Sequence, residues 1–422
     1  MTKKLEALRG MEDILPGEVE KWQWIEERAR IFFEARGFKE IRTPILEYTE
    51  LFTRSVGETS DIVSKEMFSF QDRGDRHVTL RPEMTASVAR AVIEHGLLTQ
   101  AKSLRVYYLG PMFRAERPQA GRKRQFHQIG IEIINETGWE ADLECVTLLY
   151  DFLTYTGLQN LKLKINDLGS VDQQKESAQS LRSYFEGVKG KLCKDCQWRI
   201  EKNVLRVFDC KAESCHGVID QAPWDQIAPL GEDFKMITQK LSERAIPFEI
   251  KRRLVRGLDY YNGLVFEVTA KGLGAQDSVA GGGRYDRLYS ELGGSSSFCT
   301  GFSIGQERLI ASLESQDGLL AQKAAKRKVY LAPLEDQSAV ITQIEATALS
   351  LREHGLRIET QKREFSLSKH LKKANAAGAR FILILGADEL KNGSWTVKDM
   401  DTKEQHIVSK EELFSFLMKQ MH

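Results

Sequence analysis

The segment FRAERPQAGRKRQFHQIGIEI, residues 113–133, places arginines, an aromatic ring, an amide and a carboxylate at spacings that suit ligand binding. Its second half alternates as a half-buried strand does. One face would be apolar, with Ile129, Ile131 and Ile133. The other face would carry Phe126, Gln128, Gly130 and Glu132. A basic turn returns this strand beside Arg114, whose guanidinium suits a phosphate or carboxylate. An exposed face of an antiparallel sheet would show the same pattern, so this segment alone does not establish a ligand-binding site.

A second segment, LVRGLDYYNGLVFEV, gathers Arg256, Asp259, Tyr260 and Tyr261 just before an apolar strand. Buried tyrosines need hydrogen-bond partners, and the arginine would add a second positive charge. The alternative is an ordinary strand entry with a solvated arginine.

A third segment, VAGGGRYDRLYSELGGSSSFCTGFSIGQERLI, contains Gly281–Gly283, which we interpret as a turn that lets a ligand approach the backbone. Gly301 and Gly305 flank a short strand that enters a helix, where Arg308 supplies a third arginine. The chain has no G-x-x-x-x-G-K-[ST] loop and no G-x-G-x-x-G between a strand and a helix. A nucleotide would therefore be held on a sheet by arginines.

The length and composition of the whole chain limit the kinds of protein that these segments can belong to. Its 422 residues suggest about three domains. With 41% hydrophobic residues, 29% charged residues and a net charge of +1, composition argues neither for nor against nucleic acid. The first residues lack the apolar run of a signal peptide, and no stretch approaches the ~18 apolar residues of a membrane span. We expect a cytoplasmic protein without membrane association.

Four of the six cysteines cluster in LCKDC and FDCKAESCHG, namely Cys193, Cys196, Cys210 and Cys215. This spacing is zinc-like, although four residues separate the second pair. Semi-buried thiols in a helical segment, or a redox pair, would explain the cluster as well. We include no metal in the predicted site.

The order of helical and strand patterns predicts four parts. Residues 1–168 and 248–325 would form one core, rich in strands, and residues 169–247 would be an inserted, mostly helical domain. Residues 326–422 alternate strands and helices, which predicts a small, partly parallel α/β domain.

These segments resemble the class II aminoacyl-tRNA synthetases, and among them the histidyl-tRNA synthetases. GFKEIRTPILE, MFRAERPQAGRKRQFHQIGIEI and GFSIGQERL resemble the three class motifs, whereas LRPEMT and RGLDYYNGLVFE resemble signatures of the histidine enzymes. The resemblance runs from LRGMEDILP to the C-terminal helix. One departure is Gln306, where the family usually has an apolar residue.

The resemblance implies an α/β protein with an α+β catalytic core, in which an antiparallel sheet is flanked by helices. It also implies a helical insertion and a C-terminal anticodon-binding domain. The substrates would be ATP, with Mg²⁺, L-histidine and tRNA(His), and the chain would form a homodimer through Pro44. Residues 326–422 hold sixteen Lys and Arg against thirteen Asp and Glu, so charge alone does not indicate RNA binding.

Roles follow from the same resemblance. Arg114 and Arg256 would be catalytic. ATP would be bound by Arg114, which would hold its α-phosphate, by Phe126 under the adenine, and by Glu116 and Arg308. Histidine would contact Glu83, Met84, Thr85, Gln128, Glu132, Arg256, Tyr260 and Tyr261, with Glu132 and Tyr261 on the imidazole and Gly130 leaving it room. Gln119, Arg122 and Arg124 would meet the tRNA acceptor end.

Two other functions remain open. One is a regulatory subunit of ATP-phosphoribosyltransferase, a synthetase-like protein without ligase activity. Such proteins resemble the catalytic core but lack the C-terminal domain and have degraded motifs. The other is a class II synthetase for another amino acid, which the Glu132 and Tyr261 pairing disfavours.

Overall fold

The computed structural model describes residues 4–57, 60, 62–118, 121–210, 212–270, 277–317, 320 and 328–421. The chain divides into two compact units, of which the first comprises Met1–Ile14 and Ile25–Gly318 and the second Leu15–Trp24 and Leu319–His422. No helix in the described part is long and apolar enough to cross a membrane.

The first unit is built on an eight-stranded sheet in the order β1-β5-β6-β11-β10-β9-β7-β8. Only the β1–β5 and β7–β8 pairs are parallel. The expected antiparallel core is therefore confirmed. The strands are β1 (Lys39–Glu40), β5 (Leu104–Phe113), β6 (Gln125–Ile134), β7 (Lys162–Asp167), β8 (Phe248–Ile250), β9 (Asn262–Thr269), β10 (Ser278–Arg284) and β11 (Cys299–Gly305).

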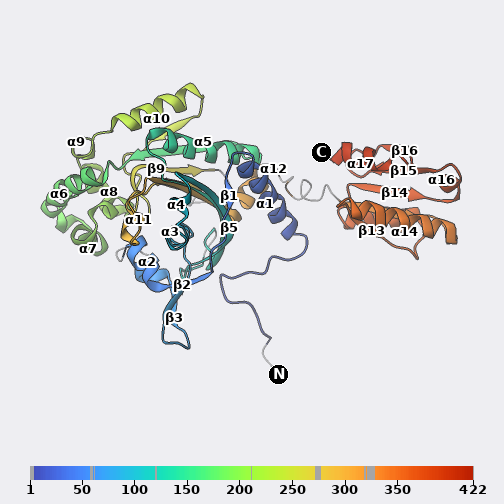
Figure 1. The fold of residues 1–422 in the computed structure, drawn as a ribbon, viewed down its shortest axis with the longest axis horizontal. Coiled ribbons are helices and arrows are strands. Elements are labelled where there is room, and N and C mark those ends of the chain that lie inside the picture. Colours follow the sequence, from blue (N-terminus) through green and yellow to red (C-terminus); the bar gives the residue numbers. More distant parts are fainter. Residues whose placement is uncertain are drawn as a thin grey trace. The chain divides into compact units, whose positions relative to one another are not determined.

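Helices cover both faces of this sheet (Figure 1). On one face, α1 (Val19–Glu34) and α5 (Trp139–Tyr155) meet through Phe33 and Phe152, whose ring centroids are 5.0 Å apart. α3 (Thr85–Glu94) lies within the concave opposite face. The predicted alternation of β6 is confirmed, because Phe126, Gln128 and Glu132 line a cavity on that concave side.

A three-stranded sheet, β2-β4-β3, adjoins the core. β3 and β4 form an antiparallel hairpin. The further elements here are β2 (Leu46–Tyr48), α2 (Thr49–Val56), η1 (Ile62–Glu66), β3 (Phe68–Gln71), β4 (His77–Leu80), α4 (Leu97–Gln100), α11 (Leu288–Glu291) and α12 (Gln306–Asp317).

Helices dominate the segment between β7 and β8, as the sequence predicts. They pack around a small apolar core that includes Leu181, Phe185, Ile200 and Trp224. The elements are α6 (Val171–Gly187), η2 (Lys189–Lys191), α7 (Lys194–Lys202), η3 (Val204–Asp209), α8 (Glu213–Asp220), α9 (Trp224–Ile227) and α10 (Glu232–Glu243).

The predicted turn at Gly281–Gly283 is wrong. These glycines lie inside β10, between β9 and β11. They are required by close neighbours: a Cβ on Gly281 would lie 2.4 Å from Arg256 Nη2, and one on Gly282 would lie 2.1 Å from the Gly301 carbonyl oxygen. The run therefore makes room for neighbouring protein groups.

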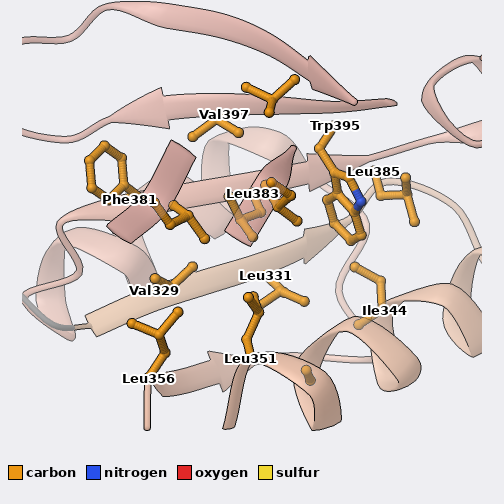
Figure 2. Close-up of a cluster of buried hydrophobic side chains, with 14 of the residues drawn as sticks. Val329, Leu331, Ile344, Leu351, Leu356, Phe381, Leu383, Leu385, Trp395 and Val397 are labelled. Atoms are coloured by element: carbon orange, nitrogen blue, oxygen red, sulfur yellow. The ribbon is translucent and has the colours of Figure 1, made fainter. Parts of the chain in front are cut away.

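The second unit contains a five-stranded sheet in the order β13-β12-β14-β15-β16, parallel on one side and antiparallel on the other. Figure 2 shows its core, in which Leu331 and Leu383 of the sheet face Ile344 and Leu351 of a helix. The predicted α/β order is confirmed. The elements are β12 (Lys328–Pro333), α14 (Ser338–Glu353), β13 (Arg357–Thr360), α15 (Leu367–Ala376), β14 (Phe381–Leu385), α16 (Ala387–Lys391), β15 (Ser394–Asp399), β16 (Gln405–Ser409) and α17 (Leu413–Met421).

Candidate active site

A cavity of about 550 Å³ opens over the concave face of the large sheet. Its walls bring together the strand, loop and helix segments that the sequence singled out. Twelve predicted residues line it: Glu83, Thr85, Arg114, Glu116, Arg122, Phe126, Gln128, Glu132, Arg256, Tyr260, Tyr261 and Arg308. Three arginines from distant parts of the chain thus share one cavity.

Arg114 is held where β5 leaves the sheet. Its Nε donates to the Pro82 carbonyl at 3.0 Å, and its guanidinium carbon lies 5.0 Å from the centre of the Phe126 ring. Burial lowers the pKa of Arg114 below its ordinary value, since a charge far from water is disfavoured. A bound anion would offset this desolvation.

Arg308 and Arg122 form a second positive region. Arg308 Nη1 donates to the Ser278 carbonyl at 2.7 Å, and its Nε and Nη2 donate to the Gly121 carbonyl. Burial, followed by the charge of Arg122, lowers the pKa of Arg308. Arg122 also pairs with Glu116 at 3.1 Å. This crowding of like charges favours a polyanion such as a triphosphate.

Arg256 approaches from the segment before β9. Its Nη1 donates to Glu267 Oε2 at 2.8 Å, and Glu267 projects from β9 into the same cavity. The Gly281 position gives the guanidinium its space. Arg256 is thereby held in one orientation by a carboxylate and a strand.

Glu132 lines the cavity and is only 1% exposed. Its Oε1 accepts from Thr85 Oγ1 at 2.7 Å, and its Oε2 accepts from the Tyr285 hydroxyl. Burial raises the pKa of Glu132 to about 8. Gly301 of β11 lies directly opposite Glu132, and a Cβ on Gly301 would lie 1.9 Å from Glu132 Oε2. This buried acid suits a partner with ring nitrogens.

Glu83 and Gln128 present acceptors nearby. Both Glu83 oxygens accept backbone N–H groups at the start of α3, from Thr85 at 2.7 Å and Ala86 at 2.9 Å. Burial raises the pKa of Glu83. Gln128 Nε2 contacts Ser303 Oγ at 3.4 Å, but its buried Oε1 has no hydrogen-bond partner among the described residues. An ammonium group would satisfy that oxygen.

Three of the predicted residues that the structure describes do not line the cavity. Met84 is buried in the core, where its sulfur accepts from Thr43 Oγ1 at 3.2 Å. Arg124 Nε donates to the Glu116 carbonyl at 3.3 Å instead of lining the cavity. Pro44 is exposed. Gln119 lies outside the described residues.

The structure also corrects the expectation for Gly130. A Cβ there would lie 2.4 Å from the Tyr108 hydroxyl, so this glycine makes room for a tyrosine of β5. Tyr108, Glu267, Tyr285 and Ser303 line the cavity and were missed by sequence reasoning. All lie on strands, or directly after one, and their polarity at alternating positions was the available signal.

Comparison with known proteins agrees with this geometry. A family model described as histidyl-tRNA synthetase matches residues 10–309, and one described as anticodon binding domain matches residues 328–420. A histidine–tRNA ligase of Natranaerobius thermophilus is 43% identical over 403 residues, covering 94% of this chain and 95% of the relative. A histidine–tRNA ligase of Desulforamulus reducens is 43% identical over 412 residues, and the match covers 97% of this chain and 98% of the relative.

Solved structures agree as well. The apo histidyl-tRNA synthetase of S. aureus is 31% identical, with a TM-score of 0.72, and the match covers 98% of this chain and all of that one. A Bacillus halodurans protein titled ATP phosphoribosyltransferase regulatory subunit/histidyl-tRNA synthetase is 22% identical, with a TM-score of 0.62 and 92% of this chain covered, which concerns the fold alone. From its family models and its relatives, the chain belongs to the histidyl-tRNA synthetase family.

Proposed function

We propose that the protein attaches L-histidine to tRNA(His) in two steps, with histidyl-adenylate as the intermediate. The observation that carries this proposal is the joint lining of one cavity by Glu132, Arg114, Arg256 and Arg308. The cavity thus offers a buried acid for an imidazole beside positive charges for a nucleotide.

Histidine would lie at the Glu132 end. Its ammonium group would donate to Gln128 Oε1, which has no hydrogen-bond partner within the described part of the chain, and to Glu83. Its imidazole would pair with Glu132 and the Tyr261 hydroxyl, beside Tyr260. An amino acid without ring nitrogens would make neither of these hydrogen bonds, and covering the carboxyl and the phenol without that compensation disfavours it by several kcal/mol.

ATP would lie over Phe126, with its phosphates among the arginines. The histidine carboxylate is already ionised, so no general base is needed for the first step. A carboxylate oxygen attacks the α-phosphorus, and the bond to the bridging oxygen of pyrophosphate breaks. Negative charge grows on the phosphate oxygens, where Arg114 and Arg256 would stabilise it, while Arg308 would hold the leaving pyrophosphate.

Mg²⁺ usually binds through one or two carboxylates together with substrate phosphates. Glu116 fits that role, because it lines the cavity and pairs with Arg122. Its negative charge also favours the charged form of Arg308 nearby. When bound, the ion would neutralise charge on the departing phosphates.

In the second step, a ribose hydroxyl at the tRNA 3′ end would attack the carbonyl carbon of the adenylate, and AMP would leave. The loop with Gln119, Arg122 and Arg124 would contact the acceptor end. The second unit would bind the anticodon, as its family match suggests. Deleting residues 326–422 should then abolish tRNA charging while adenylate formation persists.

The homodimer is part of the proposal. Pro44 is exposed, and so is the large apolar side chain that follows it, Ile45 (43% exposed). The small sheet exposes three more large apolar side chains, namely Leu46 (42%), Tyr48 (59%) and Phe70 (49%). Such a patch supports an interface with a second chain. We also retain the four predicted domains, with boundaries at 168, 247 and 325, and the cytoplasmic location as predictions.

Histidine-dependent ATP–pyrophosphate exchange is the direct test, with proline, threonine and glycine as competing amino acids. Exchange with histidine alone supports the proposal. Exchange with another amino acid would indicate a different synthetase, and the absence of exchange would favour the regulatory function.

A further inference from the structure

The helical insertion brings four cysteines together away from the active site. Their sulfur atoms, from Cys193, Cys196, Cys210 and Cys215, all lie within 4.8 Å of one another. Cys193 precedes α7 and Cys196 lies in its first turn, whereas Cys210 follows η3 and Cys215 lies in α8. We propose that these thiolates bind one structural Zn²⁺. This goes beyond the proposed ligase activity, which does not require it.

The distances suit tetrahedral zinc. Zinc–sulfur bonds of about 2.3 Å place neighbouring sulfurs about 3.8 Å apart in a tetrahedron. Cys193 Sγ and Cys210 Sγ are 3.8 Å apart. The widest separation, at most 4.8 Å, needs only small side-chain rotations to close.

The surroundings favour thiolate ligands in a closed site. The Cys193 N–H points at Cys215 Sγ at 3.1 Å, and the Ala212 N–H points at Cys210 Sγ at 3.4 Å. Backbone donors of this kind orient ligands and offset the negative charge of bound thiolates. Cys196 and Cys215 are fully buried. Four sulfur ligands would complete a tetrahedral zinc and leave no position open for a substrate, which indicates a structural site.

His216 is adjacent in sequence but is not a ligand in this arrangement. It is exposed, and its Nε2 lies 3.2 Å from the Cys210 carbonyl oxygen. The donor set is therefore four sulfurs, a set typical of structural zinc.

The insertion has a physical need for such a crosslink. Its elements between the cysteines are short, and Cys196 and Cys215 are themselves part of its small core. Short helices and small cores gain stability from a bound metal. A zinc ion would tie α7, η3 and α8 to one point.

The crosslink would also steady one wall of the active site. Between Cys196 and Cys210, Asn203 and Arg206 both donate to Asp259 Oδ1 at 2.9 Å. Asp259 directly precedes Tyr260, which lines the cavity. Zinc would thus position the substrate-binding segment indirectly, through this loop.

The test is the metal content of tag-free, full-length protein produced with zinc in the medium and purified without chelators. We expect about one zinc ion per chain, and loss of that ion in Cys196→Ser. Cys145→Ser is the matched control, because Cys145 is buried in α5 outside the cluster, and it should keep its zinc.

A second measurement avoids relying on a variant that could misfold. Replacing zinc by Co²⁺ in the wild-type chain should give the sulfur-to-cobalt charge-transfer bands and visible bands of a tetrahedral tetrathiolate site. Wild-type protein with negligible zinc and no such Co²⁺ spectrum would overturn the proposal. So would a Cys193–Cys210 disulfide found by mass spectrometry of the unreduced protein.

Discussion

The hydroxyl group of Tyr285 donates a hydrogen bond to Glu132, although 153 positions separate the two residues in the sequence. Both side chains are buried in the cavity wall, at 2% and 1% exposure. Thr85 supplies a second donor to the same carboxylate, at 2.7 Å. The acid proposed to bind the imidazole is therefore oriented by hydroxyl groups from two other segments of the chain.

Tyr285→Phe should weaken histidine binding. The substitution removes one hydrogen bond from a buried carboxyl group, worth about 1.5 kcal/mol, so we expect the KM for histidine to rise about tenfold. The KM for ATP should change little, because Arg114 and Arg308 are not touched. Pyrophosphate exchange measures both constants. Tyr289→Phe removes a hydroxyl from the same core without a described bond to Glu132, and should behave as wild type. Equal KM values in both variants would contradict the positioning role.

Twelve of the residues that line this cavity could be predicted from local sequence patterns and from the family resemblance. The alternation in β6 is readable in the sequence because one face packs in the core through Ile129, Ile131 and Ile133, whereas the other face lines the cavity. The run Gly281–Gly283 predicts a turn in the sequence but lies in a crowded central strand, and both settings require glycine. Tyr285 follows that run and was passed over, since its contact with Glu132 depends on the packing of distant strands. The hydrogen bond from Gln306 Nε2 to Glu26 Oε1, at 3.1 Å, is likewise not predictable from a local pattern, because 280 positions separate the two residues.

Arg256→Ala should lower kcat for exchange by about 10² to 10³, the usual loss when one preorganised donor to a transition state is removed. The loss should exceed any change in the KM for histidine. Arg253→Ala is the matched control, because Arg253 lies three residues away, pairs with Asp220 and does not line the cavity. Similar rates for the two variants would remove Arg256 from the catalytic step.

Gly281→Ala tests whether the position of Arg256 matters as much as its charge. A Cβ would lie 2.4 Å from Nη2 of Arg256, so the guanidinium must move. A displacement of about 1 Å can lower a rate by up to 10²-fold, and we expect a loss of at least tenfold in kcat. Gly190→Ala introduces a methyl group into open space and should leave the rate unchanged. Full activity in Gly281→Ala would mean that the arginine works equally well elsewhere.

Asp259→Asn should destabilise the first unit. Asp259 accepts from Asn203 and from Arg206, whose side chain is only 7% exposed, so the substitution leaves a buried cation without its counter-charge. We expect a loss of about 3 kcal/mol, seen as a lower denaturation midpoint. The comparison variant is Asp225→Asn, which breaks a pair with Arg252 in which the aspartate is 81% exposed, and it should change stability by less than about 1 kcal/mol. Equal midpoints would show that the Asp259 contact contributes little.

The pH dependence of stability should report the burial of Glu132. Its pKa is about 8 in the folded chain and near the ordinary 4.5 when unfolded. Between these values the folded state holds a proton that the unfolded state has lost, so the contribution of this carboxyl to stability is fully present below pH 4.5 and is lost as pH rises to 8, by up to about 1.4 kcal/mol per unit. Glu132→Gln lacks this titration, and its Tm should therefore fall less than that of the wild type between pH 5 and pH 8. The exposed Glu94→Gln is the control and should follow the wild-type curve. Parallel Tm curves for wild type and Glu132→Gln would mean that this carboxyl is ionised in the folded protein at neutral pH.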